Sequence, residues 1–189
     1  MNGAQSRRII AACLAVALCL ILWSPAGLAQ EHLWKDEHGN PVPNTKFRNE
    51  INGFGGWLVV TPDSDWEAKW NTSPETVPQF TTAGTVKRGG QLFILVFFSN
   101  PKLTDKKTAD VTCDIDVKRP DESTSVHQVD AICFRGELKG KPSNIYLSAP
   151  VIQFIGEPKD PTGKWLVRVA LKDNVRKISL PLETSFTLQ

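Results

Sequence analysis

Residues 111–117 read VTCDIDV and alternate strictly between apolar and polar side chains. The apolar residues occupy the odd positions and the polar residues occupy the even ones. This period of two is typical of a β-strand that has one face in a hydrophobic core and the other face toward solvent. The stretch therefore predicts a strand in a sheet that covers a core on one side only.

The same alternation returns near the C-terminus, at residues 165–171 and 178–188. Pro181 lies within the second of these and lacks an N–H group, so we expect that strand at the edge of a sheet. Residues 92–98, LFILVFF, form a continuous apolar run, which predicts a central strand buried on both faces. Short strands separated by turn residues, with almost no helix, predict an all-β antiparallel β-sandwich.

Composition and charge narrow the possible functions. The 189 residues are 41% hydrophobic and 22% charged, which is typical of a folded globular chain. There are 22 basic and 20 acidic residues. Arg7 and Arg8 are the only charged residues among the first 29, so the rest of the chain has 20 of each sign. This neutrality argues against nucleic acid as a partner.

Residues 1–29 have the pattern of a secretory signal peptide. Two arginines precede 15 consecutive apolar residues, 9–23, and small residues precede a predicted cleavage site after Ala29. A membrane span needs about 20 apolar residues, so an uncleaved anchor is the less favoured alternative. We therefore expect export, a periplasmic location and no stable membrane anchor once the signal is removed.

The exported part divides into two regions. Residues 30–52 are polar, contain Pro41 and Pro43 and show no regular period, so we expect an extended N-terminal arm. Residues 53–189 carry the strand pattern and are expected to form the sandwich domain. One short helix is predicted at 65–70.

Two cysteines, Cys113 and Cys133, remain after the signal is removed. A pair of cysteines in an exported protein predicts a structural disulfide. The alternative, a redox-active pair, needs close spacing and positive surroundings, whereas Asp114 and Asp116 flank the first cysteine here. We expect the bridge to link neighbouring strands of one hairpin, and a direct cross-strand pair would need a loop at about 121–125.

The segment 156–169, GEPKDPTGKWLVRV, resembles the D-P-x-G-x-W-x-V-x-V corner of immunoglobulin-like domains in exported bacterial proteins. The turn at 118–121 fits the same resemblance, which covers about residues 90–188. The whole chain is also similar to small periplasmic proteins with the same FGGWLVVTPD opening and LPLxTSFTL end. The resemblance implies an immunoglobulin-like fold and carries no activity with it. The two cysteines are too close in sequence to be the usual bridge between the sheets of an antibody domain.

The sequence contains none of the common catalytic motifs, such as G-x-S-x-G or H-E-x-x-H. Asp114 and Asp116 share one face of a predicted strand, where we expect a solvated surface. The alternative is an envelope glycan hydrolase, which would bring two carboxylates to within about 5–10 Å of each other. We predict no catalytic residue and no cofactor.

The predicted cleavage would leave Gln30-Glu31-His32 at the new N-terminus. The free amine, two amide nitrogens and the His32 imidazole could then form the square-planar nitrogen set that suits Cu(II) or Ni(II). Cyclisation of Gln30 would remove the amine. Metal binding by His32 is therefore a minor alternative function.

Trp66 and Trp70 are spaced i, i+4 and share one face of the predicted helix. We expect them to dock the helix onto the sandwich, and the alternative is an exposed platform for a sugar or a protein. The sequence thus predicts a non-enzymatic binding module for an unknown envelope protein or glycan. Its candidate surfaces are these tryptophans with residues 72–90, or the edge of strand 178–188, to which a partner strand would add.

Overall fold

The computed structural model describes residues 32–36, 38–72 and 78–189, which belong to one compact unit. The predicted signal peptide lies outside the described residues. The elements are β1 (Arg48–Ile51), β2 (Phe54–Thr61), α1 (Trp66–Trp70), β3 (Thr85–Val86), β4 (Gln91–Ser99), β5 (Thr108–Lys118), β6 (Thr124–Glu137), β7 (Ile145–Leu147), β8 (Ile152–Ile155), β9 (Gly163–Asp173) and β10 (Ile178–Leu188).

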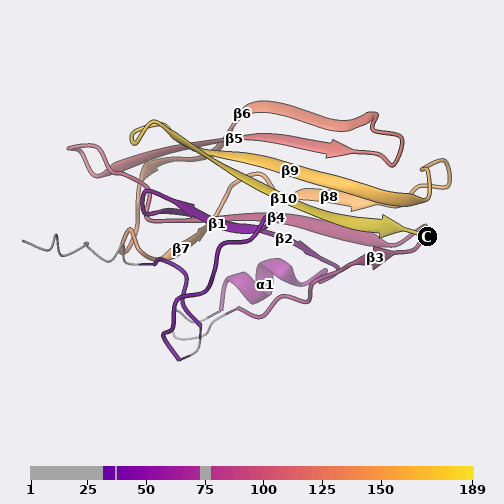
Figure 1. Ribbon diagram of the computed structural model, residues 1–189, viewed down its shortest axis with the longest axis horizontal. Coiled ribbons are helices and arrows are strands. Elements are labelled where there is room, and N and C mark those ends of the chain that lie inside the picture. The colour runs from indigo at the N-terminus through magenta and orange to yellow at the C-terminus, as the bar shows by residue number, and fades with distance from the viewer. Residues whose placement is uncertain (1–31, 37, 73–77) are drawn as a thin grey trace, which may run out of the picture. The chain divides into compact units, whose positions relative to one another are not determined.

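The strands form two stacked sheets (Figure 1). The first sheet has the order β1-β2-β4-β7, with β8 also paired to β4, and the second has the order β3-β10-β9-β5-β6. Every pair is antiparallel except β3 with β10. The order β10-β9-β5-β6 matches strands G, F, C and C′ of immunoglobulin-like sheets. The predicted all-β sandwich with one short helix is confirmed.

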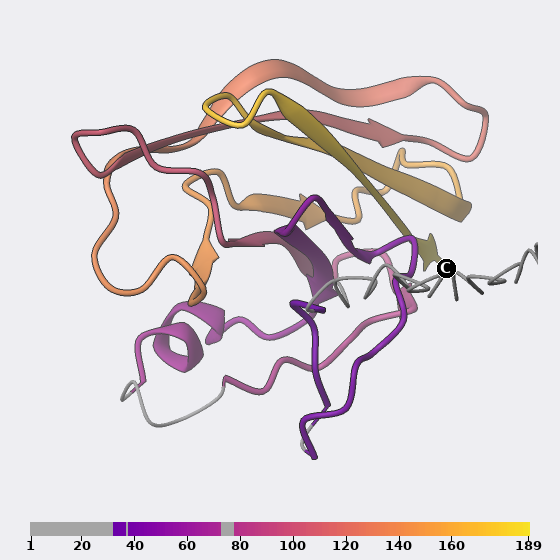
Figure 2. The same cartoon turned by 60° about the vertical axis from the view of Figure 1, so that its left-hand side comes forward.

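The predicted central strand is β4, which is buried on both faces. Its even-numbered residues, such as Leu92 and Phe98, enter the core between the sheets, where Trp165 and Phe186 also lie. Leu95 and Phe97 point to the opposite face and join a second, smaller core. This second core exists because α1 covers the outer face of the first sheet; Figure 2 shows the helix on the side away from the second sheet.

The stretch predicted as an extended arm is packed against the sandwich instead. Residues 48–51 form β1, which pairs with β2, so the sheet begins before the boundary expected at residue 53. The Trp34 side chain is only 7% exposed, and its Nε1 donates a hydrogen bond to the Asn49 carbonyl at 3.1 Å. The polar composition of this stretch did not reveal the docking, because only a few apolar residues, Leu33 and Trp34 among them, make the contact.

Cys113 and Cys133 form the predicted disulfide between the neighbouring strands β5 and β6, with a Cα–Cα distance of 5.9 Å. The two residues are not directly opposite, because Cys113 pairs with Ala131. Register shifts along the hairpin place Cys133 as an extra residue in β6. The loop therefore spans residues 119–123 rather than 121–125.

The outer edge of β10 is closed by the chain itself. Pro181 has no N–H to offer there, as the sequence predicted for an edge position. The Glu183 amide donates to the Lys46 carbonyl at 2.6 Å, and the Thr187 amide donates to the Gly84 carbonyl at 2.9 Å. Strand β3 covers the end of β10. This edge therefore lacks the continuous row of free groups that the hypothesis of strand addition requires.

Candidate functional site

The two predicted tryptophans line the inner side of the short helix. The Trp66 ring lies 6.2 Å from the Phe93 ring, and the Trp70 ring lies 5.3 Å from the Phe97 ring, measured between centroids. Both tryptophans are half-buried and pack against the second core. This is the docking arrangement expected for the helix, and it directs much of each ring toward the sheet rather than toward a ligand.

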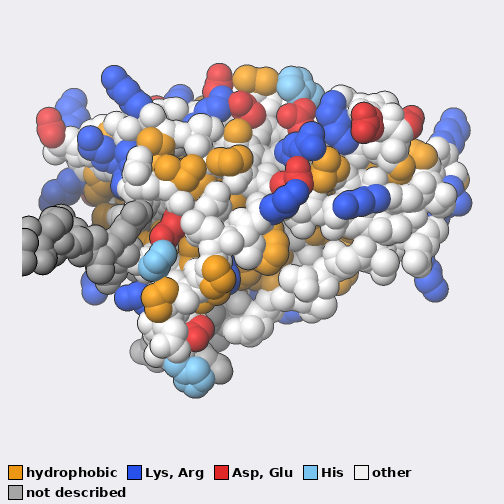
Figure 3. All heavy atoms as spheres, viewed as in Figure 1, with side chains coloured by type: hydrophobic (Ala, Val, Ile, Leu, Met, Phe, Trp, Pro, Cys, Tyr) orange, Lys and Arg blue, Asp and Glu red, His pale blue; other side chains and the backbone are white. Residues whose placement is uncertain are grey.

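Among the described residues, no helix covers the outer face of the second sheet, which carries an ordered row of charges. Cross-strand pairing aligns Glu183 on β10, Arg168 on β9, Asp116 on β5 and His127 on β6. Lys46 extends the row beyond β10. Figure 3 shows blue and red side chains alternating across the part of this face where these strands lie, with a histidine at the upper end.

Short contacts hold this row together. Glu183 accepts from Lys46 Nζ at 3.0 Å and from Arg168 Nε at 2.9 Å. Asp116 Oδ1 lies 2.6 Å from His127 Nδ1. The hydrogen bonds from Arg168 and Lys46 hold the pKa of Glu183 below its usual value. Glu183 is therefore a permanent anion at neutral pH.

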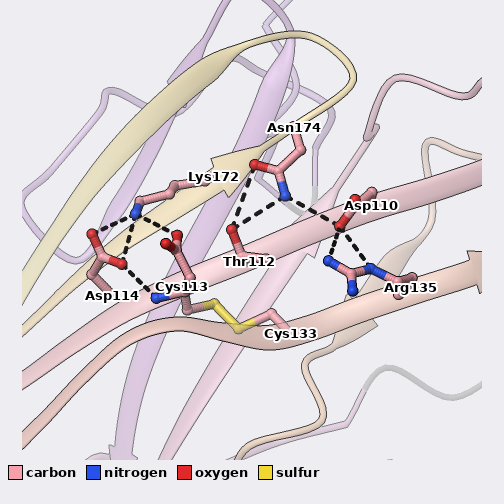
Figure 4. Close-up of polar contacts among 9 residues, drawn as sticks. Asp110, Thr112, Cys113, Asp114, Cys133, Arg135, Lys172 and Asn174 are labelled. Carbon is pink, nitrogen blue, oxygen red and sulfur yellow. Dashed lines mark hydrogen bonds and ion pairs between the residues drawn. A yellow bond between two sulfur atoms is a disulfide. The ribbon is translucent and has the colours of Figure 1, made fainter.

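A second charged cluster lies beside the row, nearer the disulfide (Figure 4). Lys172 Nζ lies 2.6 Å from the Asp114 carboxylate and 2.9 Å from Asp130 Oδ1. The Asp130 amide also donates to Asp114 at 2.9 Å. Burial acts to raise the pKa of Asp114, but the Lys172 and Asp130 hydrogen bonds outweigh it and lower that pKa.

A groove of about 860 Å³ opens between these two clusters. Ala170 on β9 and Pro181 on β10 stand directly opposite each other and both line it. Their side chains are shorter than the neighbouring Arg168 and Lys172, so the surface is hollowed there. Residues 44–46 line the groove on the β10 side. The Glu183 amide donates a hydrogen bond to the Lys46 carbonyl, which holds these residues against the edge of β10.

The groove brings together the two aspartates that the sequence singled out. Asp114 and Asp116 both line it, together with Glu183. A general acid in a glycan hydrolase needs a pKa raised toward neutrality. The pKa values of Asp114 and Glu183 are lowered instead. These two carboxylates are suited to hydrogen bonding and ion pairing rather than to proton donation.

His32 lies apart from this groove. Its Nδ1 is 3.1 Å from Glu50 Oε1, and its side chain is 51% exposed. Gln30 and Glu31, the other members of the predicted metal set, lie outside the described residues. Among the described residues, no group of three or more His, Cys, Asp or Glu side chains is arranged to hold a metal ion.

Several residues of the groove escaped the sequence analysis, namely Lys46, Arg168, Ala170 and Glu183. The alternation in 165–171 and 178–188 already places the last three on an outer face. The missing information was the register between strands, which decides that Arg168 stands between Glu183 and Asp116. No sequence pattern indicated a role for Lys46, because its position depends on a contact with Glu183, which is 137 positions away.

No family model and no curated protein matches the chain. Among solved structures it is similar to a family 123 glycoside hydrolase from Clostridium perfringens, with 9% identity and a TM-score of 0.39. That match covers 71% of this chain and only 27% of the hydrolase chain. It is also similar to a Niemann-Pick type C2 protein from Japanese carpenter ant, with 10% identity and a TM-score of 0.37. That match covers 70% of this chain and 89% of the ant protein's chain. At these scores the similarity assigns neither a family nor a function.

The disulfide is consistent with an extracytoplasmic protein. Within residues 32–36, 38–72 and 78–189, no helix has the length and apolar character needed to cross a membrane.

Proposed function

We propose that this protein is a non-enzymatic periplasmic binding module, and that the groove over β5, β9 and β10 receives an envelope protein or glycan. The observation that carries the proposal is the construction of the groove. Ala170 and Pro181 leave a hollow between two fixed charge clusters, and the segment 44–46 lines one side of it. Fixed donors and acceptors around a concave surface suit the recognition of a polar partner.

Two features favour binding over the alternative of glycan hydrolysis. Asp114 and Glu183 are ion-paired at 2.6 to 3.0 Å, and their pKa values are lowered. A hydrolase needs one carboxyl group that retains its proton near neutral pH. The signal-peptide pattern of residues 1–29 supports the proposed periplasmic location.

Metal binding at the N-terminus is a weaker alternative. A chelate with the preceding amide nitrogens would use His32 Nδ1, the ring nitrogen nearer the main chain. That nitrogen contacts Glu50, so metal binding would have to break the contact.

The test is the capture of partners from envelope extracts by immobilised protein. Ala170→Arg would place a long charged side chain in the groove. Ala68→Arg is the matched control, since Ala68 is exposed on α1, which covers the other sheet. We expect the wild type and Ala68→Arg to retain the same partner, and Ala170→Arg to lose it. Equal capture by all three proteins would show that the groove is not the binding site.

A further inference from the structure

A second hollow of about 540 Å³ continues the groove toward the β5–β6 turn. It shares Arg168 and Glu183 with the groove, so the two hollows are neighbours on the outer face and this ion pair lies at their boundary. The second hollow is lined by four cationic side chains and two anionic ones, namely Lys118, Arg119, Lys164, Arg168, Glu122 and Glu183. Its charge is therefore positive, although the exported chain as a whole is neutral.

Two of these cations are held by neutral partners. Lys118 Nζ donates to Thr124 Oγ1 at 2.5 Å. Arg119 donates to the Thr124 carbonyl at 2.7 Å, and its guanidinium lies 5.7 Å from the centre of the Trp165 ring. Within the described part of the chain, Lys118, Arg119 and Lys164 form no ion pair. They thus differ from Arg168, which is already neutralised by Glu183.

The strand register explains why these cations converge. Lys118 at the end of β5 stands opposite Leu166 on β9, and Lys164 lies two residues before Leu166 on the same face. Leu166 is half-buried and gives the hollow an apolar floor. A ligand here would meet an apolar surface beside three cations that form no ion pair within the described residues, although Arg119 interacts electrostatically with Asp121.

We infer that this hollow, which we call the cationic cradle (Lys118, Arg119, Lys164 and Leu166), binds the acidic sugar of an anionic envelope glycan. An acidic sugar combines a carboxylate or phosphate with an apolar face of C–H bonds. Its anion would accept charge-assisted hydrogen bonds from the cations, and its ring would lie against Leu166. This inference rests on the proposed binding function and names the ligand class for one end of the same face.

The surroundings of the cradle favour a glycan over an anionic membrane. Asp121 and Glu122, both exposed, lie at the tip of the β5–β6 turn beside the cradle. Hydrogen bonds from the Ser123 side chain and amide lower the pKa of Asp121, so it stays ionised. A membrane surface that reached the cations of the hollow would bring anionic headgroups against these two acids. The lining of the hollow includes Glu122 but not Asp121, and its four cations outnumber its two acids, so a single sugar meets less repulsion there than a membrane surface would.

Calorimetric titration of the purified protein with polygalacturonate, a carboxylated glycan, tests the inference. The cradle variant is Lys118→Gln/Lys164→Gln. The matched control is Lys106→Gln/Lys139→Gln, which removes the same charge at exposed positions in other loops. Arg119 is left intact because it also contacts Trp165. We expect the wild type and the control to bind, the cradle variant to bind at least tenfold more weakly, and the wild-type affinity to fall as salt is added.

Neutral dextran, inorganic phosphate and phosphatidylglycerol vesicles complete the test. None of them should match the affinity for polygalacturonate. Equal losses in the cradle and control variants would indicate a bulk charge effect and overturn the inference, as would absence of polygalacturonate binding. Tighter binding of vesicles or of free phosphate would overturn the assignment to a sugar. If polygalacturonate binding fails these criteria while Ala170→Arg still loses the captured envelope partner, the inference fails and the proposed function stands.

Discussion

The indole ring of Trp34 packs against Gly55 so closely that the glycine cannot carry a side chain. A Cβ atom at Gly55 would lie 2.9 Å from Trp34 Cζ2, and it would also collide with the Leu33 side chain. The glycine therefore creates the site at which the N-terminal segment docks on β2. This docking turns a polar stretch without visible period into part of the sandwich.

Replacing Gly55 with valine should release this segment. We expect Gly55→Val to lower the free energy of unfolding by about 2 kcal/mol through overpacking. It should also expose the chain near residue 34 to limited proteolysis. Gly84→Val is the control, since a Cβ there has no neighbour within 4 Å. Unchanged cleavage in Gly55→Val would show that the contact with Trp34 is not needed for docking.

The disulfide should contribute substantially to stability. Cys113 and Cys133 are 20 residues apart, and closing a loop of that size stabilises a fold by about 3 kcal/mol in the chain-entropy model. We expect Cys113→Ala/Cys133→Ala, and the reduced wild type, to lose comparable stability in urea denaturation. Free thiols in the wild type purified without reductant would contradict the bridge.

The Asp63 side chain, just after β2, binds both helix α1 and the segment that follows the helix. Its Oδ2 accepts from the Thr81 amide at 2.8 Å and lies 2.8 Å from Lys69 Nζ. Burial acts to raise the pKa of Asp63, but these hydrogen bonds lower it from 3.8 to about 2. The stabilisation is therefore present above about pH 4 and is lost as the pH falls toward 2.

We expect Asp63→Asn to cost on the order of 1–2 kcal/mol at pH 7 and much less at pH 2. Urea denaturation across this pH range measures both effects. Asp65→Asn, a matched change of an exposed carboxylate two residues along, should cost less at pH 7. A constant cost of Asp63→Asn at every pH would refute this role for the carboxylate.

A substitution at Trp70 distinguishes the two interpretations of Trp66 and Trp70, namely docking of the helix and a platform for a ligand. We expect Trp70→Ala to lower the free energy of unfolding by about 2 kcal/mol, because the ring packs on Phe97 in the second core. Glu67→Ala, an exposed change on the same helix, should have little effect. If Trp70→Ala leaves stability unchanged but abolishes partner capture, the platform interpretation is the correct one.

The sequence by itself determined the fold class and the disulfide. Two patterns predicted the strands, namely the alternation in 111–117 and 165–171 and the apolar run 92–98. Both depend only on which side chains are buried away from water, so the local sequence is enough to detect them. The pairing of Cys113 with Cys133 required no geometry, because no other cysteines were predicted to remain after export.

Only the tertiary structure decided the candidate site. The charge row needs the register that places Arg168 between Glu183 and Asp116, and the groove needs Ala170 opposite Pro181. The sequence also does not reveal the bulges in the β5–β6 pairing that make Cys133 an extra residue in β6. Nor does it reveal the contact between Trp34 and Gly55. Register, bulges and long-range docking are fixed by packing between distant segments, and a period of two along one strand carries no information about them.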